Sequence, residues 1–365
     1  MKLTPEQQIL CNLLKIALWP EQDKEALLTG FKQVNWDKVI SFASIQGVLG
    51  ISYDGFYDVW KSKPQLLNIP KLKQIGWELS VKSKEETNKR QKEVIKELVT
   101  LFNDNGIEVL LLKGIGLGEN YPLPMHRESG DIDLYLYGDY EKGNQMMESL
   151  DIEVERKNPK HAKFIFKGVS IENHKTFLDI KNDTVNEKLE KELHHILQEQ
   201  GYDTLRIDET EVRIPKPDFT AIFLIRHSIY HFLEEGIVLR FHCDHALFFT
   251  RNAASINFSQ FFRILEETSQ LNLFAAFMYQ AQKYLGMPTN SIPALAQNEK
   301  MAKKVFRDTI KCNPQLFATD DPEKRAYIKR KVVGAYLLLK LKWKHDLVEE
   351  PLFDRLKSSL LRSLK

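Results

Sequence analysis

The sequence predicts an α+β fold, in which helical regions at both ends of the chain flank a small mixed β-sheet. At both ends, apolar side chains recur at helical spacing over long stretches. Between them, compact apolar runs and a hairpin turn are typical of strands. We therefore predict an N-terminal helical region, an α/β core and a C-terminal helical region, at residues 1–105, 106–216 and 217–365.

The N-terminal region is predicted to begin with helices that present one apolar face. Thr4 or Pro5 opens the first, and Trp36 begins a second apolar stripe. Residues 71–105 contain neither proline nor a cluster of turn residues, so they predict one long helix. That helix should end at the C-cap pair Asn105-Gly106.

The middle region changes from helical to strand periodicity. Strands are expected where short apolar runs lie between turn residues, at 107–112, 132–136 and 153–156. Gly168 separates two further runs, 163–167 and 169–174, which predict a hairpin. A helix is expected over 140–150.

The C-terminal region returns to helical spacing after Pro215 and Pro217, and Asp218 is the expected N-cap. The helices predicted there cover 218–235, 238–251, 256–269, 272–286, 297–311 and 321–342.

Composition narrows the class of protein. The apolar share of 43% and charged share of 28% are ordinary for a soluble globular chain. The 52 basic and 50 acidic residues leave a net charge of +2, which gives no broad electrostatic footprint for nucleic acid. The three distant cysteines form no CxxC pair and fit reduced thiols in a cytoplasmic protein. No apolar run of membrane-spanning length is present, so we expect no membrane partner.

The segment Leu110–Leu136 carries the residues that indicate chemistry. Asp131 and Asp133 are two residues apart in a predicted strand, so both carboxylates should face the same side. Two such carboxylates repel each other unless a cation lies between them, and oxygen ligands of this kind suit Mg²⁺. Upstream, Lys113-Gly114 lies between a predicted strand and a predicted helix at 115–120, where backbone and helix N-terminus favour a phosphate.

This order of motifs resembles the nucleotidyltransferase superfamily that includes DNA polymerase beta, and more closely the uncharacterised bacterial nucleotidyltransferase family within it. That family's motif reads roughly LLKG, then Arg, then GDIDL, and later a carboxylate-plus-histidine strand. The matching residues here are Leu111-Leu112-Lys113-Gly114, Arg127, Gly130-Asp131-Ile132-Asp133-Leu134, Glu172 and His174.

The resemblance implies a metal-dependent nucleotidyltransferase that moves an NMP group from an NTP to an acceptor hydroxyl and releases pyrophosphate. Asp131, Asp133 and Glu172 would be catalytic and would bind Mg²⁺ or Mn²⁺. The nucleotide would be bound by Lys113, Gly114, Arg127 and His174. The acceptor is unknown and could be a small molecule, a protein or RNA.

Other interpretations stay open at this stage. Ile115 stands where the superfamily usually has a serine, which favours a non-catalytic nucleotide-binding or regulatory protein on the same fold. A toxin-like transferase acting on tRNA or protein is a further alternative. Arg127 could brace its loop instead of binding phosphate, and His227 and His231 could be core residues instead of a metal pair.

Overall fold

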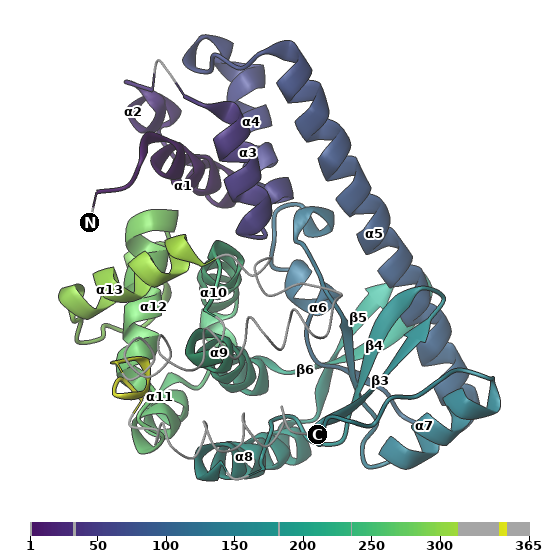
Figure 1. Cartoon of the computed structure of the whole chain (residues 1–365). Coiled ribbons are helices and arrows are strands. Elements are labelled where there is room, and N and C mark those ends of the chain that lie inside the picture. Colours follow the sequence, from purple (N-terminus) through teal and green to yellow (C-terminus); the bar gives the residue numbers. More distant parts are fainter. Residues whose placement is uncertain (1, 32–33, 182, 235, 313–342, 349–365) are drawn as a thin grey trace, which may run out of the picture. The chain divides into compact units, whose positions relative to one another are not determined.

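The computed structural model describes residues 2–31, 34–181, 183–234, 236–312 and 343–348 (Figure 1). The chain divides into two compact units, one from Lys82 to Phe223 and one from the segments before and after it. The division into three regions at 105 and 216 stays a prediction. The helix predicted over 321–342 lies outside the described residues.

The unit formed by the segments before Lys82 and after Phe223 is helical where the structure describes it. Thr4 caps its first helix by accepting a bond from the Gln7 amide at 3.2 Å, while the Gln7 side chain caps Thr4 in return. The N-terminal helices are α1 (Pro5–Leu18), α2 (Lys24–Leu28), α3 (Trp36–Ile45) and α4 (Leu49–Ser62). The later ones are α10 (Leu239–Arg251), α11 (Phe258–Glu267), α12 (Leu271–Leu285) and α13 (Glu299–Lys311). Among the helices described, none is long and apolar enough to cross a membrane.

Two helices run from one unit into the other. α5 spans Lys71–Asp104 without a break, and Gly106 follows it with φ +68°, so the predicted long helix and its glycine end are confirmed. Its second half buries Ile95, Leu98 and Phe102. α9 (Pro217–Glu234) begins one residue before the predicted start, because Pro217 takes the first helical position.

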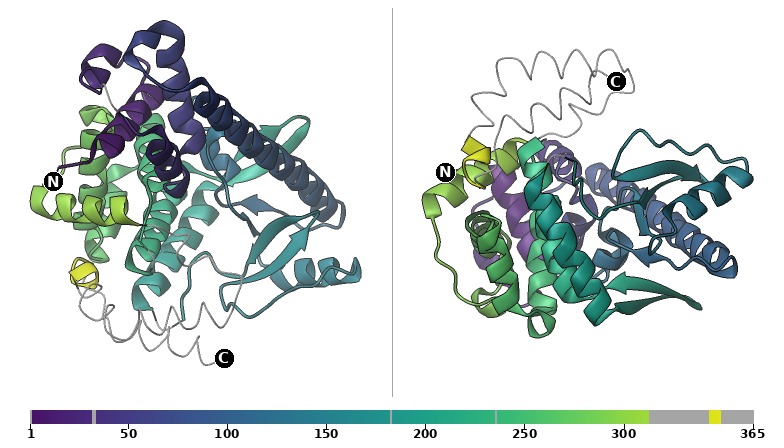
Figure 2. Two further views of the ribbon diagram at one scale, coloured as in Figure 1. Left: turned by 45° about the horizontal axis from the view of Figure 1, so that its top comes forward. Right: turned by 90° about the horizontal axis from the view of Figure 1, so that it is seen from below.

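The second unit, Lys82–Phe223, is built on a mixed sheet (Figures 1 and 2). Within the described residues the sheet has six strands, in the order β3-β4-β2-β1-β6-β5. β1 is antiparallel to β2 and parallel to β6, and β2 is parallel to β4. The strands are β1 (Leu110–Leu111), β2 (Ile132–Tyr135), β3 (His161–Phe166), β4 (Val169–His174), β5 (Tyr202–Ile207) and β6 (Thr210–Pro215). The predicted α+β class and mixed sheet are therefore confirmed.

Several details of the sheet differ from the sequence prediction. Residues 107–112 are almost all buried, yet only Leu110–Leu111 pair as a strand. The strand predicted over 153–156 is reduced to a single bridge between Glu155 and Lys163. The β5–β6 hairpin and α8 (Thr184–Gln200) were not predicted. The signal from β5 is weak because this strand is mostly exposed. In β6, however, Val212 and Ile214 alternate with charged residues, and α8 buries Leu189, Leu193 and Ile196 at helical spacing.

One face of the sheet forms the core of this unit. The second half of α5 and the helix α7 (Tyr140–Ser149) pack against it. The strands contribute buried side chains at alternate positions, including Ile132, Leu134, Phe164, Ile171 and Val212. Residues at the intervening positions of β2, β3 and β4 therefore project from the opposite face.

Candidate active site

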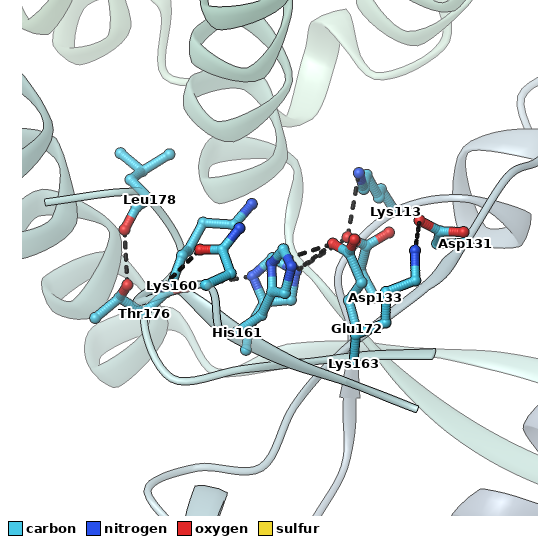
Figure 3. Close-up of polar contacts among 11 residues, drawn as sticks. Lys113, Asp131, Asp133, Lys160, His161, Lys163, Glu172, Thr176 and Leu178 are labelled. Atoms are coloured by element: carbon cyan, nitrogen blue, oxygen red, sulfur yellow. Dashed lines mark hydrogen bonds and ion pairs between the residues drawn. The ribbon is translucent and has the colours of Figure 1, made fainter. Parts of the chain in front are cut away.

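Strand register gathers the polar side chains of β2, β3 and β4. Asp133 lies opposite Glu172 in the parallel β2–β4 pair. In the antiparallel β3–β4 pair, Lys163 lies opposite Glu172 and His161 lies opposite His174. Directly opposed residues share a face, and the period of two adds His174 to the face of Glu172. These five side chains therefore form one polar cluster on the sheet (Figure 3).

Asp131 lies just before β2, two residues ahead of Asp133. Its Oδ2 is 3.4 Å from the Lys163 ammonium. Burial raises the pKa of Asp131; the charge of Lys163 opposes this rise, and the charge of Glu172 adds to it. Asp131 is therefore a carboxylate whose ionised form is disfavoured by its surroundings.

Asp133 is the most buried carboxylate of the cluster, with 1% of its surface exposed. Its Oδ1 lies 3.1 Å from Lys113 Nζ and 3.0 Å from His174 Nε2. Burial alone raises the pKa of Asp133, but the Lys113 charge and the His174 bond together hold it well below its usual range. Its Oδ2 is buried and has no hydrogen-bond partner among the described residues.

Glu172 faces two imidazoles. Its Oε2 is 3.3 Å from His161 Nδ1 and 3.7 Å from His174 Nε2. Burial raises the pKa of Glu172, but the bond with His174 and the neighbouring positive groups lower it to about 2. Burial also lowers the pKa of His161 to about 4, so this imidazole is neutral at physiological pH.

Lysines balance part of the negative charge. Lys113 contacts Asp133 and Lys163 contacts Asp131. Lys160 is nearby, and its pKa is lowered by burial and by the Lys113 charge. The repulsion between the aspartates is thus relieved partly by the chain itself, which the sequence argument did not foresee. The buried Oδ2 of Asp133 still has no hydrogen-bond partner within the part of the chain that the structure describes, and an all-oxygen set of carboxylates fits a hard divalent cation there.

The loop after β1 supports the expected phosphate position. Gly114 has φ +74° and ψ −115°, a conformation open to glycine and strained for other residues. A Cβ there would lie 3.8 Å from the Asp131 carbonyl, so space is available and the backbone conformation is what requires glycine. The following helix α6 (Ile115–Gly118) is a single turn, shorter than predicted. Ile115 packs into the core, which explains an apolar residue at the superfamily's serine position.

Arg127 contacts the backbone of this loop. The guanidinium is buried, and its Nη1 donates to the Gly114 carbonyl and to the Ser129 hydroxyl, both at 3.1 Å. The Asn88 side chain donates to the Arg127 carbonyl at 2.8 Å. These contacts favour a bracing role for Arg127, which was the alternative left open by the sequence.

His227 and His231 of α9 are not part of the polar cluster on the sheet. The His227 and His231 rings lie 4.5 Å apart and both contact Phe241. No third ligand joins them into a candidate metal cluster among the described residues. This agrees with the interpretation of both as packed histidines.

Sequence reasoning missed two members of the cluster, His161 and Lys163, and the neighbouring Lys160. A signal for two of them was present. The turn at Lys167-Gly168 fixes the hairpin register, and counting back from it places His161 and Lys163 opposite His174 and Glu172. For Lys160, which precedes β3, the sequence offers no comparable signal.

The mixed sheet, the glycine loop after β1 and the Asp-Ile-Asp strand are together typical of nucleotidyltransferases. Residues 32–286 match the family described as "Uncharacterised nucleotidyltransferase", and the chain belongs to this family. Comparison with curated proteins found no match. Among solved structures, the chain is similar to an antigenic nucleotidyltransferase-like protein from Paracoccidioides brasiliensis, at 16% identity over 43% of this chain and 74% of that chain. The TM-score of 0.31 is too low to support an argument about the site.

Proposed function

We propose that this chain transfers a nucleoside monophosphate from an NTP to an acceptor hydroxyl, with release of pyrophosphate. The observation that carries the proposal is the register of β2 against β4. It puts Asp133 beside Glu172 on one sheet face, with Asp131 two residues away and the Gly114 loop next to Asp131. Family membership supports the reaction class.

Asp131, Asp133 and Glu172 are the proposed ligands of divalent metal, Mg²⁺ or Mn²⁺. When bound, such an ion supplies positive charge for phosphate oxygens and for the attacking oxygen. The chain's own contribution is to hold the three carboxylates in place and to keep Asp133 and Glu172 ionised. Lys113 and His174 do this for Asp133, since both contact its Oδ1.

Proton removal from the acceptor hydroxyl needs a group with sufficient basicity. Glu172, with a pKa near 2, is a weak base, whereas the pKa of Asp131 is raised. Asp131 is also the more exposed of the two aspartates. We assign the proton acceptor to Asp131, and to Glu172 a role in binding and orientation.

The triphosphate would lie against the Gly114 loop. Its backbone can approach the phosphates because no side chain projects from Gly114. Lys113 is 24% exposed and can turn its ammonium from Asp133 to a phosphate. Arg127 would act as a positioning residue that fixes the Gly114 carbonyl, and His174 as one that fixes Asp133.

A binding protein that transfers nothing is the second candidate, favoured by Ile115 in place of a serine. The orphaned Asp133 oxygen argues for a bound cation, because a buried unpaired carboxylate oxygen is costly unless a cation uses it. A transferase and a metal-dependent nucleotide binder would share that cation, so transfer of label is what separates them. A transferase acting on tRNA or protein would use the same site, so the acceptor has to be found by experiment.

The test is a labelling experiment. Purified protein is incubated with cell lysate, each α-labelled NTP in turn, and Mg²⁺ or Mn²⁺. A labelled product that forms with wild-type protein and disappears with Asp131→Asn supports the proposal. If nucleotide binds with metal, as measured by calorimetry, while no product is labelled with any NTP, the binding protein is the correct alternative.

A further inference from the structure

Two imidazole nitrogens converge on one oxygen of Glu172. Glu172 Oε2 is 3.3 Å from His161 Nδ1 and 3.7 Å from His174 Nε2. One ligand atom from each of His161, Glu172 and His174 can be chosen so that all lie within 4.8 Å of one another. Figure 3 shows His161 and Glu172 meeting beside Asp133. This spacing is suited to a single metal ion between the three groups.

The hydrogen bonds of His174 orient its other nitrogen into this space. His174 Nδ1 lies 3.2 Å from the Thr176 carbonyl oxygen, which can only accept, so Nδ1 carries a proton. The Nε2 atom then faces Asp133 Oδ1 at 3.0 Å and Glu172 Oε2 at 3.7 Å. A nitrogen lone pair facing two carboxylate oxygens requires a cation, either a proton on Nε2 or a metal ion. Metal-binding histidines characteristically donate their second N–H to a carbonyl in this way.

His161 supplies a second, independent observation. Only 9% of its surface is exposed, and its Nδ1 is buried with no hydrogen-bond partner among the described residues. A buried imidazole nitrogen without a partner is costly in an ordinary core. The atom points to the same Glu172 oxygen as His174 does, and a bound ion would satisfy it.

We propose that His161, Glu172 and His174 bind a divalent transition ion of the Zn²⁺ class, on the histidine side of Glu172, which this site would share with the proposed Mg²⁺ site. Imidazole nitrogen suits Zn²⁺ and Co²⁺, whereas Mg²⁺ takes oxygen ligands. Two histidines and one glutamate also form the ligand set of catalytic zinc sites, which keep a further position open. The inference goes beyond the proposed transfer reaction, because this ion could bind even in a chain that transfers no nucleotide.

Cobalt provides the direct probe. Metal-stripped full-length protein is titrated with Co²⁺ and followed by visible absorption, and then challenged with excess Mg²⁺ and with Zn²⁺. We expect a saturable visible band that Zn²⁺ abolishes and that Mg²⁺ leaves in place. X-ray absorption of the Zn²⁺-loaded wild-type protein should then show two imidazole ligands, a result that requires no variant to fold.

His161→Ala is the informative variant, and His195→Ala is its matched control. His195 is exposed on α8 of the same unit and lies outside the cluster. Changes outside a ligand shell already weaken metal binding by about 10- to 100-fold, so removal of a ligand should cost at least that. Zn²⁺ affinity should therefore fall by at least about tenfold in His161→Ala and stay unchanged in His195→Ala.

Three results would overturn the inference: no cobalt band in wild type, a band displaced equally by Mg²⁺, or one imidazole or none in the absorption spectrum. An absent cobalt band would mean that a proton on His174 Nε2 is the cation that faces Asp133, whereas either of the other two results would mean that the two histidines do not form the proposed ligand set. Glu172 is common to both proposals, but labelling that requires Mg²⁺ and Asp131 can persist after any of these results, so the transfer reaction and this site fail separately.

Discussion

Two hairpins flank the central β1–β2 pair, and their charged residues differ in surroundings. In β5–β6, Arg213 pairs with Glu108 at 2.6 Å while 30% and 58% of the two side chains are exposed, and it stacks over Tyr202. In β3–β4, His161, Glu172 and His174 are at most 15% exposed and face a buried aspartate. Both hairpins complete the same sheet, but only the second gathers charge where water is largely excluded.

The difference shows where the sheet supports chemistry and where it supports only structure. An exposed ion pair gains about 0–1 kcal/mol because water screens it. A buried charge without a partner costs several kcal/mol, so buried charges are found where other groups or ions compensate them. We therefore expect changes on the β2–β4 face to have large effects and changes on β5–β6 to have small ones.

The largest effect is expected for Asp133→Asn. Labelling should fall by at least about 100-fold, since a lost metal ligand removes several kcal/mol of charge stabilisation and each 1.36 kcal/mol is tenfold. Because the ionised Asp133 is stabilised by Lys113 and His174, the variant should also lose roughly 1–3 kcal/mol of unfolding free energy, measured by urea denaturation.

Asp131→Asn is the control for the predicted loss of stability in Asp133→Asn. The pKa of Asp131 is raised, so loss of its charge should leave stability level or increase it, while labelling is lost as in Asp133→Asn. Equal destabilisation by both variants would contradict the assignment of different environments to the two carboxylates.

Gly114→Ala should have the next largest effect. The positive φ of Gly114 should cost alanine roughly 1–2 kcal/mol of stability, although a Cβ has room there. Gly116→Ala, two residues along in the helical turn, would meet only Ile214 at an ordinary 3.5 Å and should be neutral or stabilising. The two variants are compared by thermal melts and by calorimetry with NTP. If both lose NTP affinity equally, Gly114 has no special role in nucleotide binding.

A pH-dependent effect on stability is expected at Glu172. The folded-state pKa of Glu172 is about 2, below its ordinary 4.5. Its ionised form therefore adds stability that is fully present above pH 4.5 and is lost as the pH falls toward 2. Urea denaturation across this range should show a shallower loss in Glu172→Gln than in wild type. Parallel curves would mean that Glu172 is not held by its histidines.

The smallest effect is expected for Arg213→Met on β6. The variant removes the exposed contact with Glu108 and should change stability by less than about 1 kcal/mol. Labelling should stay at the wild-type level. A loss of labelling in a folded Arg213→Met protein would show that chemistry extends to the second hairpin.

Local signals predicted much of the fold. The long helix α5, the turn at Gly168 and the C-terminal helices up to α13 followed from periodicity and turn residues. The β5–β6 hairpin was not predicted, although Val212 and Ile214 of β6 alternate with charged residues; β5 is mostly exposed and gives a weaker signal. For the site, Asp131, Asp133 and Glu172 were named from spacing and resemblance. The parallel register of β2 against β4 is a long-range pairing that no local pattern specifies, and that register brings Glu172 to Asp133.

The central claim is that the β2–β4 face transfers an NMP group, and the position of the transferred phosphate tests it most directly. Lysate is incubated with wild-type protein, divalent metal and the same NTP labelled at either the α- or the γ-phosphate. The account predicts that the α-label enters the product and the γ-label leaves in pyrophosphate, with neither transferred by Asp131→Asn. Transfer of the γ-label, or α-labelling that survives in Asp131→Asn, would contradict it.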